Sequence, residues 1–395
     1  MKFNYRANKY LIVFIIFSAY LIIINTNKKK KKILVIDLSI PTFDTNAGNR
    51  CTFMYLKLLK ELGFNVTFFA ADFINREPYT SILQKNEIEV LYGDYYKKNI
   101  TIWLKDNIKH YNFVYLQRPE VADKYLDIIK EHYKGKIIYF GHDLHYLRLL
   151  RKSKLINNTS IKNESEIVQK QEMEIFSKVD VIHVVGNYEE KILKDIFLHK
   201  PIRNIPIYIY YKQLSNVEKD FSKRHGIIYI GNFRHPPNID AILWFIKDIF
   251  PLIIKKFPDI ILHIVGSYIP IELKKLENKN IKFEKYLSDD NLRILYGKCR
   301  IAIAPLRYGA GVKGKLVEAA YNQIPMITTS IGGEGLDSSI GSFIIENDPN
   351  KMANLISDLY INFSKLKQMS DSGKVFIEKY FSFKRAKEQL MKDLN

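Results

Sequence analysis

Cysteine is scarce in this sequence, which contains only Cys51 and Cys299 among 395 residues. Two cysteines cannot build a framework of disulfide bridges, and they lack the close paired spacing of a structural zinc site. We interpret both as small buried residues. Internal repeats and low-complexity segments are also absent, so the sequence gives no sign of a repeat architecture.

Acidic residues are missing from the first 32 positions, which hold eight lysines and arginines. The formal net charge of +19 therefore falls to 19 minus 8, or +11, for the rest of the chain. The remaining lysines are scattered, without the basic stripe or the aromatic stacking motif that nucleic-acid binding uses. We therefore expect no nucleic-acid partner, although the positive charge favours anionic ligands or a membrane surface.

A hydrophobic run, residues 10–24, lies between these basic flanks. As a helix it would be about 22 Å long, shorter than a hydrocarbon core of roughly 30 Å, so it would need bilayer thinning or snorkelling lysines. We predict that residues 1–32 form a single-pass membrane anchor, and the heavier basic flank after the run weakly places the globular part in the cytosol. A cleaved signal peptide and an interfacial helix are the alternatives.

Short apolar runs alternate with helix-length amphipathic stretches from residue 33 onward. Such alternation favours a parallel sheet covered on both faces, and it restarts after a charged stretch near residue 222. The composition, 47% hydrophobic and 26% charged, suits a packed globular protein, and the length suggests two large domains. We predict an α/β fold with two doubly wound domains, residues 33–222 and 223–375, and a C-terminal helix, 376–395, that packs back on the first.

A glycine-rich turn, residues 307–314, lies between an expected strand and an expected helix. Residues 309–315 fit the phosphate-loop pattern G-x-x-x-x-G-K, but Leu316 lacks the hydroxyl that this pattern uses to bind Mg²⁺. Backbone N–H groups at such a turn, together with the start of the following helix, are suited to an anion. We interpret the turn as a nucleoside diphosphate site and keep a phosphate-loop NTPase as an alternative.

The side chains around this turn suit the two halves of such a ligand. Lys313 or Lys315 can supply a positive charge, and Glu318 lies on the same helix face as Lys315, where it can accept hydrogen bonds from a ribose diol. The set contains no metal ligand, and the HDLH motif at residues 142–145 has no third cluster to complete a metal site. We therefore expect neither a metal nor a cofactor. Three glycines would let the backbone approach the diphosphate closely: Gly309, Gly311 and Gly314.

Residues 231–336 resemble the carboxyl-terminal domain of glycosyltransferase family 4, a group with the GT-B fold. The matching pieces are GNFRHPPNIDAILWF, FPDIILHIVG, RIAIAPLRYGAGVKGKLVEAAYNQIPMITT and IGGEGL. The first half is similar to the same family in IDLSIPTFDTNAGNR, RPE and GHDLHYLRLLRK. The resemblance implies two Rossmann-like domains facing a cleft. It also implies retaining transfer of a sugar from a nucleotide-diphosphate sugar to an acceptor, a glycan, lipid or protein-linked group that the sequence does not identify.

The resemblance also implies roles for individual residues. His142 resembles the histidine beside the transferred sugar and is the candidate catalytic residue. Glu318 resembles the glutamate that takes the ribose hydroxyls. The donor diphosphate would be held by Arg234, Lys315, Gly311 and Gly314. The donor sugar would be contacted by Gly48, Ala310, Val312, Lys313 and Glu334.

The sequence departs from the family pattern at one position. Many members carry two glutamates separated by seven residues, and Ala310 stands where the first should be. We expect the missing sugar contact to be absent or supplied by another residue such as Glu334, which leaves the identity of the sugar open. The departure also motivates an alternative function, that of a non-catalytic, membrane-anchored nucleotide-sugar binder.

Overall fold

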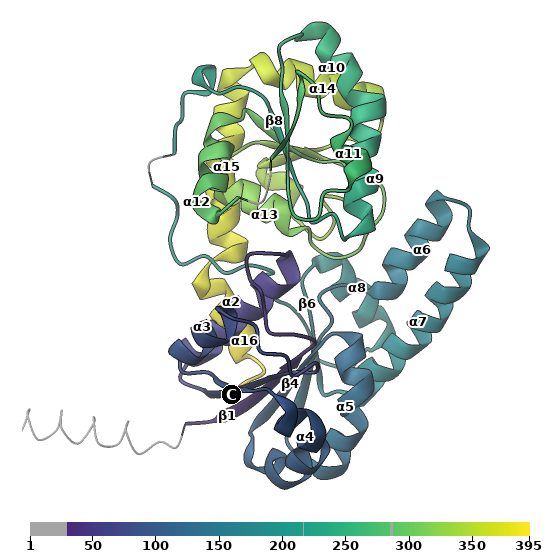
Figure 1. Ribbon diagram of the computed structural model, residues 1–395, viewed down its shortest axis with the longest axis vertical. Helices are drawn as coiled ribbons and strands as arrows, with labels where there is room; N and C mark the ends of the chain where they lie inside the picture. Colours follow the sequence, from purple (N-terminus) through teal and green to yellow (C-terminus); the bar gives the residue numbers. More distant parts are fainter. Residues whose placement is uncertain (1–29, 216, 285–286) are drawn as a thin grey trace, which may run out of the picture.

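Two parallel β-sheets organise the chain (Figure 1). The computed structural model describes residues 30–215, 217–284 and 287–395. We call the units built on the two sheets the first and the second domain. The predicted fold class, two doubly wound α/β domains, is confirmed.

The first domain contains a seven-stranded sheet with the order β3-β2-β1-β4-β5-β6-β7, in which all paired strands run parallel. Its strands are β1 (Lys32–Asp37), β2 (Asn65–Ala70), β3 (Glu89–Leu91), β4 (Phe113–Gln117), β5 (Lys136–Phe140), β6 (Val181–Val184) and β7 (Ile202–Asn204). Its helices are α2 (Ala47–Glu61), α3 (Tyr79–Lys85), α4 (Asp94–Asn107), α5 (Pro119–His132), α6 (His145–Leu155), α7 (Thr159–Lys178) and α8 (Asn187–Ile196).

The second domain contains a six-stranded parallel sheet with the order β10-β9-β8-β11-β12-β13. Its strands are β8 (Ile227–Ile230), β9 (Leu262–Val265), β10 (Ile281–Glu284), β11 (Ile301–Ala304), β12 (Met326–Thr328) and β13 (Phe343–Ile345). Its helices are α9 (Pro236–Trp244), α10 (Phe250–Lys256), α11 (Ile271–Lys274), α12 (Asp289–Lys298), α13 (Gly314–Tyr321), α14 (Pro349–Ile361) and α15 (Phe363–Phe381).

The strands read as near-continuous apolar runs because both faces of each sheet are covered. In β1, for example, every residue after Lys32 is buried, as are all four residues of β11. Runs of Ile, Val and Leu without polar alternation are typical of parallel strands between two helical layers. Polar residues therefore collect where the strands end, and these ends face the neighbouring domain.

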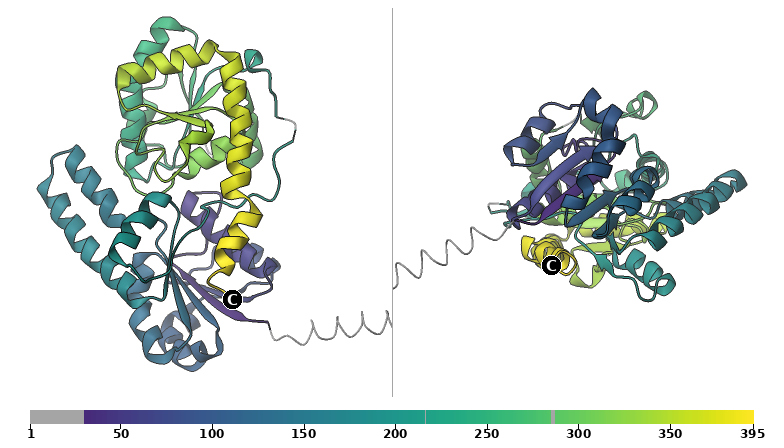
Figure 2. Two further views of the ribbon diagram at one scale, coloured as in Figure 1. Left: turned by 180° about the vertical axis from the view of Figure 1, so that it is seen from behind. Right: turned by 90° about the horizontal axis from the view of Figure 1, so that it is seen from below.

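The end of the chain crosses from one domain to the other (Figure 2). Helix α15 packs on the second domain, where Gly373 lies against the backbone of Ala320. Helix α16 (Phe383–Met391) continues to the first domain. There Lys136 donates a 2.6 Å hydrogen bond to the carbonyl of Asp393, whose carboxylate lies 3.2 Å from His183.

Helix α9 begins at Pro236, two residues before Asn238. Proline is favoured in the first helical turn because it needs no hydrogen bond for its nitrogen. Asn238 thus lies inside the helix, where its side chain serves the site described below. The same helix does not continue uniformly to residue 257, since a π-helical turn, Phe245–Ile249, interrupts it before Pro251.

The predicted membrane location is corrected. Across residues 30–215, 217–284 and 287–395, no helix is both long enough and apolar enough to cross a bilayer. The expected anchor, residues 1–32, lies outside the described residues except for its last three.

Candidate functional site

The carboxyl ends of the two sheets face each other, and the candidate site lies between them. In the second sheet β8 and β11 are neighbours whose connections leave in opposite directions, and ligands of open α/β sheets bind at such a switch point. The loop after β8 touches the first domain, since the Asn232 side chain donates a 3.1 Å hydrogen bond to the carbonyl of Thr45.

The glycine-rich turn follows β11 and approaches the first domain closely. Gly309 and Gly311 have φ values of +149° and +68°, a region that favours glycine. A side chain at Gly311 would place its Cβ 3.0 Å from the Cβ of Asp143 and 3.2 Å from the carbonyl oxygen of His142. Gly314 is equally constrained, because a Cβ there would lie 2.5 Å from the hydroxyl of Tyr208.

The N–H groups of the turn lack partners. In the described part of the chain, residues 310–314 donate none of the backbone hydrogen bonds, and α13 begins at Gly314 with no side-chain cap. Unpaired N–H groups in a turn at a helix N-terminus form a site for an anion. The diphosphate site predicted for this turn stays a prediction.

Lys315 stands in the first turn of α13 with its ammonium facing neutral oxygens. Its Nζ lies 2.8 Å from the Asn238 Oδ1 and 3.3 Å from the Tyr229 hydroxyl, and 4.4 Å from the centre of the Tyr229 ring. Among the described residues it forms no salt bridge. Burial, together with the charge of Lys313, lowers the pKa of Lys315 to about 7. An anionic ligand would supply the missing counter-charge.

Lys313 has a different role in the structure. Its Nζ donates hydrogen bonds to the carbonyls of Ala310, at 3.0 Å, and Gly311, so it closes the turn on itself. Burial lowers its pKa to about 8 against the opposing effect of Glu334 and Glu189. The side chains of Ala310 and Val312 are buried, at 8% and 6% exposure. A ligand can therefore meet residues 310–313 mainly through their backbone.

Arg234 and Glu318 are the other two charged residues that the sequence assigned to the nucleotide. Arg234 is exposed in the loop after β8, with its guanidinium 3.6 Å from the centre of the Tyr268 ring. Glu318 is one turn after Lys315 in α13, and its side chain is 16% exposed. Burial raises the pKa of Glu318, and the nearby Arg50 opposes that rise.

The first domain places His142 opposite the turn. His142 follows β5 with a φ of +68°, and its Nε2 lies 3.0 Å from the Gln117 Oε1. With the Gln117 amide in this orientation, the His142 Nε2 carries the proton and donates it to the Gln117 Oε1. The buried His142 Nδ1 and the buried Gln117 Nε2 then have no partner among the described residues. Burial and then Arg118 lower the pKa of His142 well below its usual value. The ring is therefore neutral at pH 7 and presents an unpaired acceptor.

Four polar residues that the sequence did not assign to the site hold this edge together: Asp37, Thr52, Gln117 and Arg118. Asp37, which ends β1, accepts hydrogen bonds from the Arg118 Nε at 2.7 Å and the Thr52 hydroxyl at 2.8 Å. Thr52 also lies 2.8 Å from Gln117. Gly48 fits here because a Cβ would lie 2.9 Å from the Arg118 Nη2. A polar residue at the end of an apolar strand, as in ILVID and FVYLQ, is the signal that could have found Asp37 and Gln117.

Asp143 lies beside the turn, next to Gly311, and its carboxylate is already engaged. Its oxygens lie 2.5 Å from Arg148 and 3.1 Å from His145. Burial alone would raise the pKa of Asp143, but these two partners outweigh burial and hold it well below the usual range. Asp143 is therefore a poor proton acceptor at neutral pH.

Glu334, expected near the donor sugar, forms an ion pair across the two domains. Arg151 on α6 binds both of its carboxylate oxygens, one of them at 2.9 Å, and also donates to the Gly309 carbonyl at 2.7 Å. The Glu334 side chain is only 8% exposed. The structure thus places Glu334 against Arg151, and its predicted contact with a sugar would have to share that partner.

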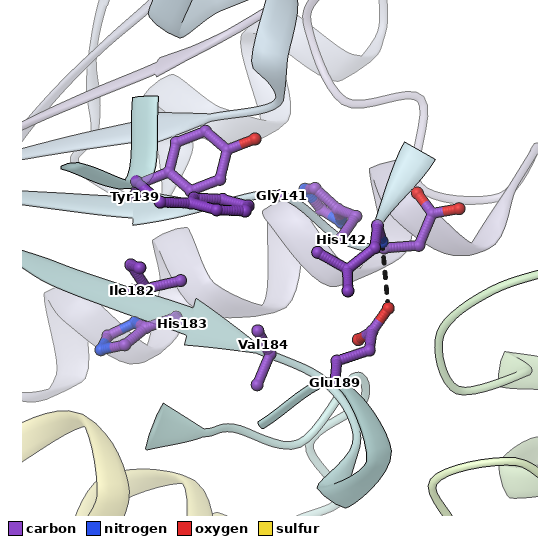
Figure 3. Close-up of a pocket in the computed structure, with 10 residues that line it drawn as sticks. Tyr139, Gly141, His142, Ile182, His183, Val184 and Glu189 are labelled. Atoms are coloured by element: carbon purple, nitrogen blue, oxygen red, sulfur yellow. Dashed lines mark hydrogen bonds between the residues drawn. The ribbon is translucent and has the colours of Figure 1, made fainter. Parts of the chain in front are cut away.

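A small cavity lies beside His142, at the carboxyl ends of β5 and β6 (Figure 3). Its free volume of about 10 Å³ has room for about one water molecule. Figure 3 shows His142 and Glu189 together on one side of it, away from His183. Glu189 accepts a 3.0 Å hydrogen bond from the Leu144 N–H, and burial raises the pKa of this carboxyl to about 8. Glu189 therefore supports the loop that carries His142.

Leu316 gives no support to the phosphate-loop alternative. Its side chain is 2% exposed and belongs to the hydrophobic core, where it cannot reach a metal ion. In the part of the chain that the structure describes, no group of three or more His, Cys, Asp or Glu residues could hold a metal. The expected absence of a metal stays a prediction.

Comparisons with known proteins define the family of the second domain. Residues 224–362 match the family model described as Glycosyl transferases group 1, so this part of the second domain is similar to that family. The resemblance inferred from the sequence is thereby confirmed at the level of this family.

A curated relative from Klebsiella pneumoniae, an uncharacterized 44.6 kDa protein in the cps region, is 32% identical over 177 residues. The alignment covers 42% of this chain and 45% of the relative, less than half of that protein's length.

Solved structures share the fold over nearly the whole chain. Sucrose-phosphate synthase from Thermosynechococcus elongatus has a TM-score of 0.68 at 14% identity and covers 92% of this chain and 98% of its own. TarM of S. aureus has a TM-score of 0.71 at 12% identity, covering 93% and 99%. Anabaena HepE, solved with UDP-glucose, has a TM-score of 0.61 at 13% identity, covering 92% and 99%. The GT-B arrangement predicted from the sequence is confirmed.

Proposed function

We propose that this chain is a retaining glycosyltransferase that moves a sugar from a nucleoside-diphosphate sugar to an acceptor hydroxyl on a glycan, a lipid or a protein-linked group. One observation carries the proposal. The unpaired N–H groups of residues 310–314 lie beside Lys315, which faces only neutral oxygens, and both belong to a glycosyl transferases group 1 domain.

The turn would hold the diphosphate and stabilise it as it leaves. Negative charge grows on the leaving diphosphate as the bond to the sugar breaks, and donors that are already in place stabilise it without reorganisation. Lys315 and the turn supply such donors, and the exposed Arg234 reaches the rim of the same site. These cations provide charge that a metal would otherwise supply, so we propose that the reaction proceeds without one.

Glu318 would accept hydrogen bonds from the ribose. It lies one helical turn beyond Lys315, which matches the order of diphosphate and ribose in a nucleotide. Two similar structures support this class of donor, since Anabaena HepE was solved with UDP-glucose and the pneumococcal transferase GtfA with UDP and GlcNAc.

The sugar would lie between the turn and His142. Sugar hydroxyls are donors and acceptors, which suits the unpaired Nδ1 of His142 and the unpaired Nε2 of Gln117. The engaged state of Asp143 supports retention, because a carboxylate held by Arg148 and His145 is a weak base for activating an acceptor from the opposite face.

Ala310 motivates a second candidate, a nucleotide-sugar binder without turnover. Its methyl group packs with the core of the first domain, where the family usually carries a carboxylate near the sugar. The two candidates differ only in catalysis, so binding and turnover must be measured together.

The test uses the full chain with UDP-glucose, UDP-GlcNAc, GDP-mannose and ADP-glucose. A ligand that binds only the folded protein raises its melting temperature. We expect at least one donor to do so and to release its nucleoside diphosphate when an acceptor is present. Binding without release in any acceptor mixture would favour the second candidate, and no shift with any donor would contradict both.

A further inference from the structure

Arg50 is held in place by the first domain. It lies in the first turn of α2, which Asn46 caps by accepting a 2.9 Å hydrogen bond from the Asn49 N–H. The Arg50 Nε donates a 3.1 Å hydrogen bond to the carbonyl of Phe43, and its guanidinium lies 6.0 Å from the centre of the Tyr208 ring. The base of the side chain therefore has a fixed direction.

The far side of the same guanidinium reaches the second domain. Its Nη2 lies 2.7 Å from an oxygen of Asp289 at the start of α12, and its Nη1 lies 3.4 Å from the Glu318 Oε1 on α13. The planar arginine fork can hold several acceptors at once, which a lysine cannot do with the same geometry. Arg50 thus joins three separate elements around the carboxylate that we assign to the ribose.

The contact leaves Glu318 able to receive a ligand. Arg50 engages only Oε1, at the long end of hydrogen-bond distance, and no described residue donates to Oε2. An ionised carboxylate is purely an acceptor, which is what two ribose hydroxyls require. Burial raises the pKa of Glu318, and Arg50 is the group that opposes this rise.

We propose that Arg50 is a positioning residue for the ribose: supplied by the first domain, it aims the Glu318 carboxylate so that the nucleoside site is complete only when the two domains meet. This inference rests on the proposed function and deepens it. It makes the nucleotide site a product of both domains, although every residue assigned to it so far belongs to the second.

The test measures how strongly the protein recognises the ribose hydroxyls. Calorimetry gives the Kd of UDP, 2′-deoxy-UDP and 3′-deoxy-UDP for the full wild-type chain and for Arg50→Gln, with the guanosine and adenosine series used if UDP does not bind. Hydrogen bonds to a charged group contribute enough that removing a hydroxyl should weaken wild-type binding by about tenfold or more. We call the Kd of a deoxy analogue divided by the Kd of UDP the deoxy ratio. In Arg50→Gln we expect the deoxy ratio to fall to about twofold.

A merely structural role for Arg50 predicts a different result. If Arg50 only joins the domains, the affinities of all three nucleotides fall together in Arg50→Gln and the deoxy ratio stays at its wild-type value, which overturns the proposal. Arg50→Lys, which keeps the charge without the fork, should recover only part of the ratio and also serves if Arg50→Gln does not fold.

Two further variants separate this inference from the proposed function. Arg293→Gln changes an exposed arginine on α12 that pairs with Asp290 at 3.3 Å, and it should keep the wild-type ratio. In Glu318→Gln, UDP and its deoxy analogues should bind with the same affinity, whether or not Arg50 is present. If the wild-type chain binds none of UDP, GDP and ADP, the proposed function itself fails. If it binds and discriminates while Arg50→Gln discriminates equally well, only the role of Arg50 fails.

Discussion

The carboxyl edges of the two sheets differ in how their polar groups are satisfied. On the second sheet, the N–H groups of residues 310–314 lack partners among the described residues, and Lys315 faces the neutral oxygens of Asn238 and Tyr229. On the first sheet, charges are matched, as in the pairs of Arg118 with Asp37 and of Arg148 with Asp143. Among the described residues, the unpaired side chains at this edge include the neutral groups of His142, Gln117 and Tyr139.

This difference indicates how the two domains divide the ligand. Unpaired donors with positive charge suit a diphosphate, whereas unpaired neutral groups suit the hydroxyls of a sugar. Variants around the turn of the second domain should therefore change nucleotide binding. Variants of the first domain should change the handling of the sugar, with the exception of Arg50, which we propose acts on the ribose.

Lys315→Ala should have the largest effect. Removing a charge that stabilises the leaving diphosphate should lower kcat/KM by at least about 100-fold. The melting temperature should be kept or raised, because the variant also removes a buried ammonium without an acidic partner. Steady-state kinetics and thermal denaturation test this, with the exposed Lys274→Ala as the control. Wild-type turnover in Lys315→Ala would refute the role of this residue.

His142→Asn tests the first domain. Asparagine tolerates the left-handed backbone at this position, so the loop should be kept. We expect kcat to fall by about 10- to 100-fold because the sugar loses a neutral partner, while the Kd of the free nucleoside diphosphate stays unchanged. An equal loss of nucleotide affinity would break the division between the two domains.

The affinity for the donor should depend on pH through Lys315. Its pKa of about 7 in the free protein means that the ammonium is present below pH 7 and is lost above it. A diphosphate binds the charged form, so binding above pH 7 requires uptake of a proton. The Kd of a nucleotide sugar should therefore rise by up to about tenfold per pH unit above 7.

Lys315→Arg provides the control for this pH dependence, since arginine stays protonated throughout the range. Calorimetry between pH 6 and 8.5 should give a rising Kd for the wild type and a flat one for the variant. Identical slopes in the two proteins would assign the dependence to another group.

Glu334→Gln should have the smallest effect on the ligand. It weakens the ion pair with Arg151 that joins the domains and leaves a half-buried arginine with a poorer partner, which we expect to cost about 1–3 kcal/mol of stability. A lower melting temperature with a donor Kd within threefold of the wild type is expected. Asp290→Asn, on an exposed carboxylate, is the matched control. A large loss of donor affinity would instead support a sugar contact by Glu334.

The sequence was informative where local pattern decides structure. Apolar runs such as ILVID and RIAIAPL predicted parallel strands, and the glycines around residue 311 predicted the turn. The short strands β3 and β7 lack a comparable pattern and were not identified. No local pattern marks the role of Asn238, because its side chain binds Lys315, a partner 77 positions away.

Contacts between the domains could not be predicted in the same way. Arg50 and Glu318 are 268 positions apart, and Arg151 and Glu334 are 183 positions apart, so no local spacing relates them. For Glu334, the family pattern suggested a contact with the sugar, whereas the fold supplies an arginine from the facing domain. Such pairs depend on how the two folded domains pack against each other.

The most direct test of the account is hydrogen–deuterium exchange of the glycine-rich turn. The full chain would be compared without ligand and with a saturating nucleotide sugar from the thermal screen. We predict that the amides of residues 310–314 exchange markedly more slowly in the complex, because they donate hydrogen bonds to the diphosphate. Unchanged exchange at this turn in a protein saturated with donor would contradict the central claim.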